Sequence, residues 1–240
     1  MLFNIKTLLL ITLLFLSQGA VAQSNPTLKP YKALYNVKFR GLSGGDIEFS
    51  LKKQNTDQFV FSSRLLPNFL GSMFTSDQAE DISVLMPDEA GIKPLHFNSE
   101  DGSKKSGNDI SYNFDWSINQ VKGHYKDQDF TLAVPHGVQD RLSIQLSASL
   151  ALQAGKEPGK LIMLEKNELQ EYLITRQGTE HIRTQAGEFD TVVLKSERAG
   201  SSRITRYWYA ARLGYLPVRA ERTSKGKVDV VMELKSIQFQ

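Results

Sequence analysis

Apolar and polar residues alternate with a period of two over most of the chain, beginning at Tyr31. In the run Tyr31–Phe39, every second residue is tyrosine, alanine, valine or phenylalanine, and most residues between them are polar. Alternation of this kind places the two side-chain sets on opposite faces of a β-strand. It is interrupted by GLSGG and resumes over 46–53. Two alternating runs around a Gly-rich turn predict a β-hairpin.

Similar runs recur to the end of the chain, separated by short polar turns such as PDEAG, RQGTE and TSKGK. The further predicted strands are 59–65, 79–85, 95–99, 110–116, 130–134, 161–165, 172–176, 189–196, 204–210, 216–222 and 228–239. Strands at this spacing indicate an antiparallel meander that curls on itself. No long linker divides the chain, so we expect one β-rich domain over 31–240, preceded by a short lead-in over 23–30.

One stretch, PHGVQDRLSIQLSASLALQAG at 135–155, has a helical period instead. At 100° per residue its apolar side chains form two stripes on roughly opposite sides. One stripe is Val138, Leu142, Leu146 and Leu150, and the other is Ile144, Ala148 and Leu152. A helix that is apolar on several sides is enclosed by protein. The predicted fold is therefore mainly β, a curled antiparallel sheet or incomplete β-barrel around one central α-helix over about 138–154.

The only charges in this helix are the adjacent Asp140 and Arg141 near its start. Asp140 is expected to cap the helix, because its carboxylate can accept from the first free backbone N–H groups. Arg141 has two interpretations, as a ligand for an anionic group or as half of a structural pair at the barrel mouth. Leu142 and Leu146 are expected to be structural core residues.

Four aromatic residues are further candidates for binding an apolar ligand. Trp116 and Trp208 can line a sugar or lipid site, although each is more often part of the core or its rim. Phe69 and Phe74 lie in LPNFLGSMFTS, an apolar segment that fits neither period. That segment is either a lid over a cavity or an ordinary loop packed on the core.

The first 22 residues have the pattern of a secretory signal peptide. Lys6 precedes an apolar run from Leu8 to Leu16, and Ala20-Val21-Ala22 forms an Ala-x-Ala cleavage site. The run is too short for the roughly 20 residues of a spanning helix. We expect cleavage after Ala22 and a periplasmic product with no transmembrane segment. Cysteine is absent and basic and acidic residues nearly balance, 29 against 26, with no basic stripe for nucleic acid.

Several segments resemble bacterial exported proteins of domain-of-unknown-function family 3108. GVQDRLSIQLSASLAL is similar to that family's Gln-Asp-Arg-Leu-Ser segment. The other matching segments, in the expected order, are YKALYNVKFRGLSGGDIEFSL, GIKPLHF, NFDW, TQAGEFDTVVLKSER, YWYAARLGYLPVRAE and VVMELKSI. The resemblance covers roughly 31–237 and implies an exported β-rich domain with no assigned catalytic residues.

RYWYAARLGYLPVRAE is also similar to a hairpin of the periplasmic lipoprotein-carrier group. Those proteins are open half-barrels that hold acyl chains against an inner helix. Gly214 in a turn and Pro217 on an edge are expected to have structural roles in this hairpin, and such a pattern can also arise separately. The chain departs from that group at Ala210–Arg212, where an acidic turn residue is usual.

These observations favour non-catalytic binding or carriage of an apolar or amphiphilic envelope molecule, or scaffolding of an envelope assembly with another envelope protein. The alternative is an enzyme acting on envelope polysaccharide or peptidoglycan through carboxylates that the fold brings together. Glu48, Glu80, Asp81 and Asp115 lie in or beside strands, but no sequence feature pairs two of them. GLSGG matches Gly-x-Ser-x-Gly without the following helix of a nucleophile elbow. No two of the four histidines lie within four residues of each other, and we expect neither metal nor cofactor.

Overall fold

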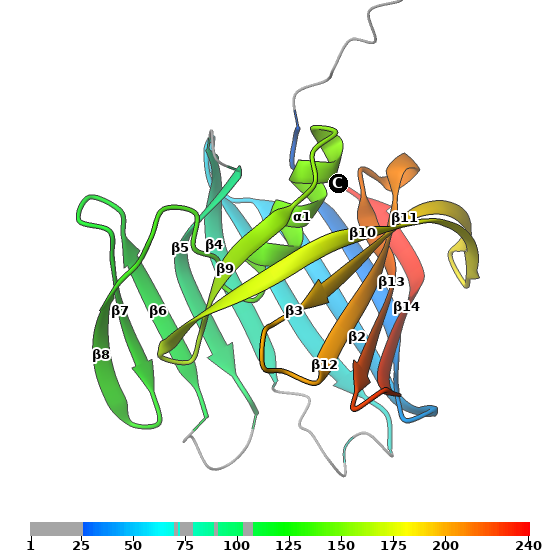
Figure 1. Ribbon diagram of the computed structural model, residues 1–240, viewed down its shortest axis with the longest axis horizontal. Coiled ribbons are helices and arrows are strands. Elements are labelled where there is room, and N and C mark those ends of the chain that lie inside the picture. The colour runs from blue at the N-terminus through cyan, green and yellow to red at the C-terminus, as the bar shows by residue number, and fades with distance from the viewer. Residues whose placement is uncertain (1–25, 70–71, 73–78, 89–90, 103–107) are drawn as a thin grey trace, which may run out of the picture.

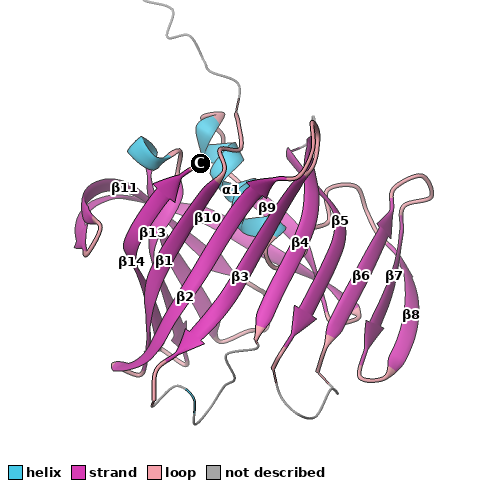
Figure 2. Cartoon of the chain, turned by 180° about the vertical axis from the view of Figure 1, so that it is seen from behind, coloured by secondary structure: helices cyan, strands magenta, loops and turns pink. Residues whose placement is uncertain are grey.

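The computed structural model describes residues 26–69, 72, 79–88, 91–102 and 108–240. These residues form one antiparallel 14-stranded sheet that curls around the α-helix α1 (Figures 1 and 2). The predicted fold class is therefore confirmed. The predicted signal peptide over 1–22 and the candidate residue Phe74 lie outside the described residues. Within the described parts of the chain, no helix has the length and hydropathy needed to cross a membrane.

The elements follow one another along the chain with short connections. Their bounds are β1 Tyr31–Phe39, β2 Leu42–Lys53, β3 Phe59–Pro67, β4 Glu80–Asp88, β5 Gly91–Glu100, β6 Ile110–Asp115, β7 Gln120–Tyr125, β8 Gln128–Ala133, α1 Ser143–Gln153, β9 Gly159–Glu165, β10 Glu168–Thr184, β11 Gly187–Glu197, β12 Arg203–Ala210, the short 3-10 helix η2 Ala211–Leu213, β13 Leu216–Ser224 and β14 Lys227–Phe239.

The strand order is β8-β7-β6-β5-β4-β3-β2-β1-β14-β13-β12-β11-β10-β9. The first and last strands are thus neighbours inside the sheet, where Tyr31 pairs with Phe239. The two edge strands, β8 and β9, are successive strands of the chain, and α1 lies between them in the sequence. The sheet is curled but not closed, and α1 lies between its two arms, β1–β8 and β9–β14 (Figure 1).

Several strands are longer than the sequence predicts, for example β2 and β5, and in two further cases a glycine explains the difference. β7 was not predicted because Gly123 interrupts its pattern. A Cβ added at Gly123 would lie 2.3 Å from Cζ of Phe130 on β8, so the glycine makes room for that ring. β10 runs through the predicted turn RQGTE, because Gly178, with φ of +129°, forms a bulge and the pairing with β11 continues beyond it.

The two apolar stripes of α1 pack into two separate parts of the core. Leu142, Leu146 and Leu150 belong to a large cluster with residues of most strands, those of β1–β5 among them. Ala148 and Leu152 pack into a second cluster with residues of β10–β12, which lie across the helix. The helix is therefore held between the two arms of the curled sheet, as its sequence pattern predicts.

The helix begins at Ser143, five residues later than predicted. The stretch before it is extended, because the backbone of Gln139 pairs with β9. Its N–H donates to the Ile162 carbonyl, and its own carbonyl accepts from the Leu164 N–H, both at 2.8 Å. The second bond takes the carbonyl that a helix starting at Val138 would use as an acceptor.

Candidate ligand-binding cavity

A cavity of about 500 Å³ lies between α1 and the concave face of the sheet. Its walls come from β1–β3, one side of α1 from Gln145 to Gln153, the lead-in before β1, η2 and the turn from it into β13, and two residues of β14. Since a water molecule occupies roughly 30 Å³ in the liquid, this space is far larger than a few waters. It falls within the range of about 300–1,000 Å³ that is usual for small-molecule sites.

The inner wall of the cavity is aromatic and aliphatic. Five of its residues are inward-facing side chains of β1, β2 and β3, namely Tyr31, Tyr35, Phe49, Leu51 and Phe61. Tyr35 and Phe49 meet edge to face, with ring centroids 5.5 Å apart. These residues were predicted as one face of alternating strands, but no sequence signal distinguishes a core residue from a cavity wall.

Two hydroxyl groups at the wall are bonded within the protein. Tyr35 donates its O–H to the Pro217 carbonyl at 2.8 Å. Ser149 on α1 lies within hydrogen-bond distance of the Gln145 and Tyr215 carbonyls, at 3.2 and 2.9 Å. Polar groups that already make hydrogen bonds within the protein do not require a polar ligand group beside them. The interior is therefore suited to an apolar molecule.

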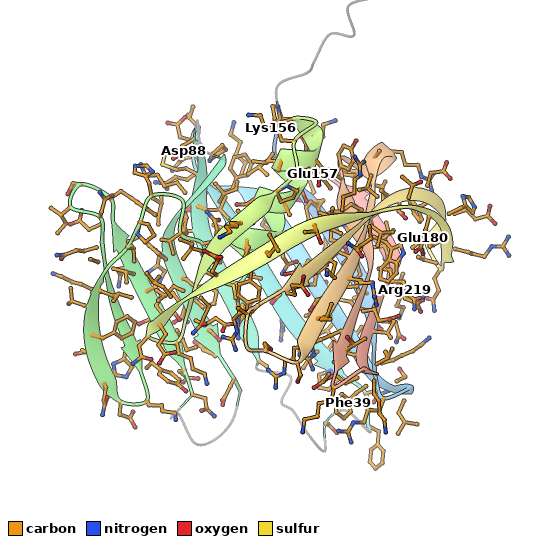
Figure 3. All side chains as sticks on the ribbon, in the orientation of Figure 1. Phe39, Asp88, Lys156, Glu157, Glu180 and Arg219 are labelled. Atoms are coloured by element: carbon orange, nitrogen blue, oxygen red, sulfur yellow. The ribbon has the colours of Figure 1, made fainter. Side chains whose placement is uncertain are left out.

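We call the mouth of the cavity the part of its wall that is formed by the exposed residues Lys29, Arg212 and Phe239. Figure 3 labels Lys156, just after α1, and Phe39 at the opposite end of the molecule. Gln153 ties two parts of the mouth together. Its Oε1 accepts from the Thr27 N–H at 2.9 Å, and its Nε2 donates to the Gly214 carbonyl at 3.0 Å. The lead-in segment is thus fixed across the rim.

Gly214 and Pro217 shape the β12–β13 wall of the cavity. Gly214 ends η2 in the left-handed region, with φ of +67°, where glycine is favoured. Pro217 is on β13, which lies between β12 and β14, but the pairing with β14 begins only at Arg219, so Pro217 has a strand partner on the β12 side alone. It sits beside a register shift in the pairing with β12, one of the positions in a sheet where proline is tolerated.

Four of the five candidate ligand residues, Arg141, Trp116, Trp208 and Phe69, are described by the structure, and none of these four lines the cavity. Trp208 is on the other face of β12, where its indole N–H donates to Glu180 Oε2 at 2.8 Å and the Arg219 guanidinium lies over its ring (Glu180 and Arg219 are labelled in Figure 3). Trp116 donates to the Pro94 carbonyl at 2.7 Å. Phe69 is 84% exposed. These aromatic rings are used elsewhere in the fold or face solvent.

The Gln-Asp-Arg-Leu-Ser segment fastens the start of α1 to three strands. Gln139 donates from Nε2 to the Ile92 carbonyl on β5, at 2.8 Å, while its backbone pairs with β9. Arg141 makes a two-pronged ion pair with Asp81 on β4 and also bonds Ser99 on β5. Its side chain is 48% exposed, so it is half of a surface pair and does not enter the core. Arg141 is therefore part of an attachment of the helix to the sheet.

Asp140 is completely buried and caps the helix from one turn before its first assigned residue. Its Oδ1 accepts from the N–H groups of Leu142 and Ser143, both at 2.8 Å, and its Oδ2 accepts from the Ser83 hydroxyl at 2.6 Å. In return, the Ser143 hydroxyl oxygen accepts from the Asp140 N–H at 2.9 Å. Burial raises the pKa of the Asp140 carboxyl above its ordinary value, and these hydrogen bonds oppose part of the rise.

Three of the four carboxylates considered for catalysis have partners of their own, and the fourth, Glu80, is paired with none of them. Glu48 pairs with Lys32 at 2.8 Å, Asp81 pairs with Arg141, and Asp115 accepts from Ser117. Hydrogen bonds from Ser117 hold the pKa of Asp115 below its ordinary value. Across the described ranges, no three histidine, aspartate or glutamate side chains are grouped closely enough to hold a metal ion.

Comparison with known proteins agrees with the fold. The model of a family described as "Protein of unknown function (DUF3108)" matches residues 34–235, as the sequence resemblance led us to expect. Among curated proteins, none matches the sequence significantly.

The chain is also similar to solved structures. One is a β-barrel-like protein of domain of unknown function DUF1849 from Brucella abortus, with 8% identity, 89% of this chain and 98% of that chain covered, and a TM-score of 0.54. A candidate exported protein with a YmcC-like fold from Bacteroides fragilis has 11% identity, 89% and 97% coverage, and a TM-score of 0.35. A candidate outer membrane lipoprotein-sorting domain from Vibrio parahaemolyticus has 9% identity, 88% and 86% coverage, and a TM-score of 0.28. Of these three, the Brucella protein alone is similar enough to support an argument, and that argument concerns the fold.

Proposed function

The chain belongs to the DUF3108 family, and from its cavity we propose that it binds an apolar or amphiphilic molecule between α1 and the sheet, without catalysis. The observation that carries the proposal is the space of about 500 Å³ beside Tyr35, Phe49 and Leu146. A protein that only scaffolds other proteins needs a packed interior and an apolar surface patch. A space of this size inside an apolar wall is a feature of ligand binding.

The hydrophobic effect supplies the affinity in this proposal. Moving one methylene group from water into an apolar environment contributes about 0.8 kcal/mol. A single alkyl chain therefore gains enough to bind reversibly, provided that its walls need no rearrangement. The wall residues here are held by β-strand pairing and by α1, so the site is formed before the ligand arrives.

We also propose that the protein works in the periplasm after removal of residues 1–22. The support is the pattern of Lys6, the apolar run and Ala20-Val21-Ala22. An exported protein of this kind encounters lipids and other amphiphiles of the envelope, which fit an apolar site. N-terminal sequencing of the protein isolated from the periplasm tests this part of the proposal, and a start at Gln23 is expected.

Binding is tested on purified, delipidated protein with a fluorescent fatty-acid probe, together with mass spectrometry of molecules that copurify before delipidation. A blocking variant is Met232→Trp, because Met232 lies on β14, lines the cavity and is only partly buried. The larger side chain fills part of the space. We expect probe binding by the wild-type protein and at least a tenfold loss in Met232→Trp.

The matched control is Leu173→Trp, on β10. Leu173 is 39% exposed and does not line the cavity, so the variant adds the same indole outside the site. It should bind the probe as the wild type does. If delipidated wild-type protein takes up no probe, or if both variants lose binding equally, the proposed function is wrong.

A further inference from the structure

We infer that the molecule bound in the cavity is an anionic amphiphile, whose carboxylate or phosphate head is held at the mouth by Lys29 and Arg212. This inference rests on the proposed function and narrows the class of ligand. Its basis is the charge of the cavity wall. Lys29 and Arg212 are its two charged residues among the described ones, and no aspartate or glutamate lines it.

Both cations are free to pair with a ligand. Lys29 and Arg212 are exposed, and neither takes part in any ion pair among the described residues. By contrast, the half-buried Arg219 pairs with Glu221 and Glu233. The charges of Lys29 and Arg212 are therefore available to a ligand.

Arg212 is held in place by groups that leave its charge unneutralised. Its guanidinium stacks on the Phe189 ring at 4.2 Å, and one of its terminal nitrogens donates to the Glu188 backbone carbonyl at 2.7 Å. The other nitrogens remain for an incoming anion. A planar guanidinium held in this way suits carboxylate or phosphate oxygens, which it can bind in pairs.

Lys29 is positioned by its neighbours in the lead-in. The Thr27 N–H donates to Gln153, and the Pro30 carbonyl accepts from the Gln240 N–H at 3.0 Å. The backbone is thus fixed on both sides of Lys29, while its side chain remains exposed. Lys29 and Arg212 both border the same space, in which the apolar part of the ligand lies.

The negative groups near Lys29 and Arg212 are bonded to other residues. The Glu188 carboxylate pairs with Arg183, and Glu157 pairs with Arg176. The final turn of α1 presents partly negative carbonyls, but those of Leu150, Ala151 and Leu152 accept from the N–H groups that follow the helix. An anionic head is therefore the group that complements the mouth.

The test measures the affinities of three ligands with the same alkyl chain by isothermal titration calorimetry. Palmitate has a carboxylate head, palmitoyl lysophosphatidylglycerol has a phosphate, and monopalmitoylglycerol is uncharged. In the double variant Lys29→Gln/Arg212→Gln we expect at least one anionic ligand to lose roughly tenfold in affinity, with no change for monopalmitoylglycerol. The anionic ligand with the larger loss identifies the preferred head. Its affinity for the wild type should also fall with added salt, because the charges are exposed.

The matched control is Arg203→Gln/Lys227→Gln, which removes one arginine and one lysine at the other end of β12 and β14. It should bind all three ligands as the wild type does. The single variant Lys29→Gln, at an exposed site, guards against a folding defect caused by loss of the Arg212 stacking. Equal affinities of the two cavity-mouth variants and the wild type for both anions overturn the inference while leaving the proposed function intact. Failure of all three ligands to bind the wild type overturns the proposed function itself.

Discussion

Replacing Asp140 by alanine is expected to destabilise the protein more than any other change in the Gln-Asp-Arg-Leu-Ser segment. The carboxyl group is 0% exposed and accepts three hydrogen bonds. Asp140→Ala leaves the Leu142 and Ser143 N–H groups and the buried Ser83 hydroxyl without their acceptor. Loss of a helix cap costs about 1 kcal/mol, and buried donors without partners cost about 1–3 kcal/mol. Alanine avoids the burial of a carboxyl group, which offsets part of this loss.

We therefore expect a net loss of about 3 kcal/mol of unfolding free energy. For a domain of this size, 1 kcal/mol shifts the Tm by about 2–4 °C, so the expected decrease is roughly 6–12 °C. Thermal unfolding followed by circular dichroism measures it. Asp140→Asn is the matched control, because its amide oxygen can still accept from the two N–H groups, and it should lose less than half as much.

A comparison of the wild type with Asp140→Asn at different pH values tests the raised pKa of Asp140. In the unfolded chain the carboxyl has its ordinary value of 3.8, and burial raises it in the folded protein. A proton is thus bound more tightly by the folded state, so the contribution of Asp140 to stability is greatest below 3.8 and decreases as pH rises through the folded pKa. The stability of the wild type relative to Asp140→Asn should decrease over that range. A decrease in Tm of less than about 2 °C for Asp140→Ala would refute the reasoning. A stability of the wild type relative to Asp140→Asn that rises with pH would refute it as well.

Two further changes test the sheet and the surface pair. Gly123→Ala should lower stability by about 1–3 kcal/mol, because the new methyl group overlaps the Phe130 ring and forces it to move. Hydrogen exchange should accelerate in the edge strand β8, and additive effects of Gly123→Ala and Phe130→Ala in a double-mutant cycle would contradict this explanation. Arg141→Ala should cost about 1 kcal/mol or less, since its side chain is 48% exposed and water can replace it beside Asp81. A larger loss of Tm than in Asp140→Ala would show that the pair matters more than the cap.

Local patterns were sufficient to predict the sheet and the enclosed helix. The alternation that starts at Tyr31 defines which side chains face inward, and the two stripes of α1 require protein on both sides of the helix. The glycines limited the prediction, because Gly123 and Gly178 read as breaks in a strand. In the folded chain, the first accommodates a neighbouring ring and the second forms a bulge.

The cavity could not be predicted in the same way. Tyr35 and Phe49 have the sequence pattern of any inward-facing strand residues, and whether they meet a side chain or a space depends on the packing of α1. Trp116 and Trp208 are candidate ligand residues by residue type alone. Their indole N–H groups are bonded to Pro94 and Glu180, away from the cavity. Lys29 and Arg212 lie 183 positions apart in the sequence, and no local signal connects them.

The pairing of β1 with β14 determines when the cavity can exist during folding. All other neighbouring strands in the sheet are also consecutive strands in the chain, so two meanders, β1–β8 and β9–β14, can each form through local contacts. The β1–β14 junction closes a loop of nearly the whole chain, which is the slow, entropically unfavourable kind of contact. Tyr31 and Tyr35 contribute to the cavity from one side of that junction, and Met232 and Phe239 from the other. A ligand in the cavity therefore binds only the joined form, and its binding energy holds the beginning and the end of the chain together.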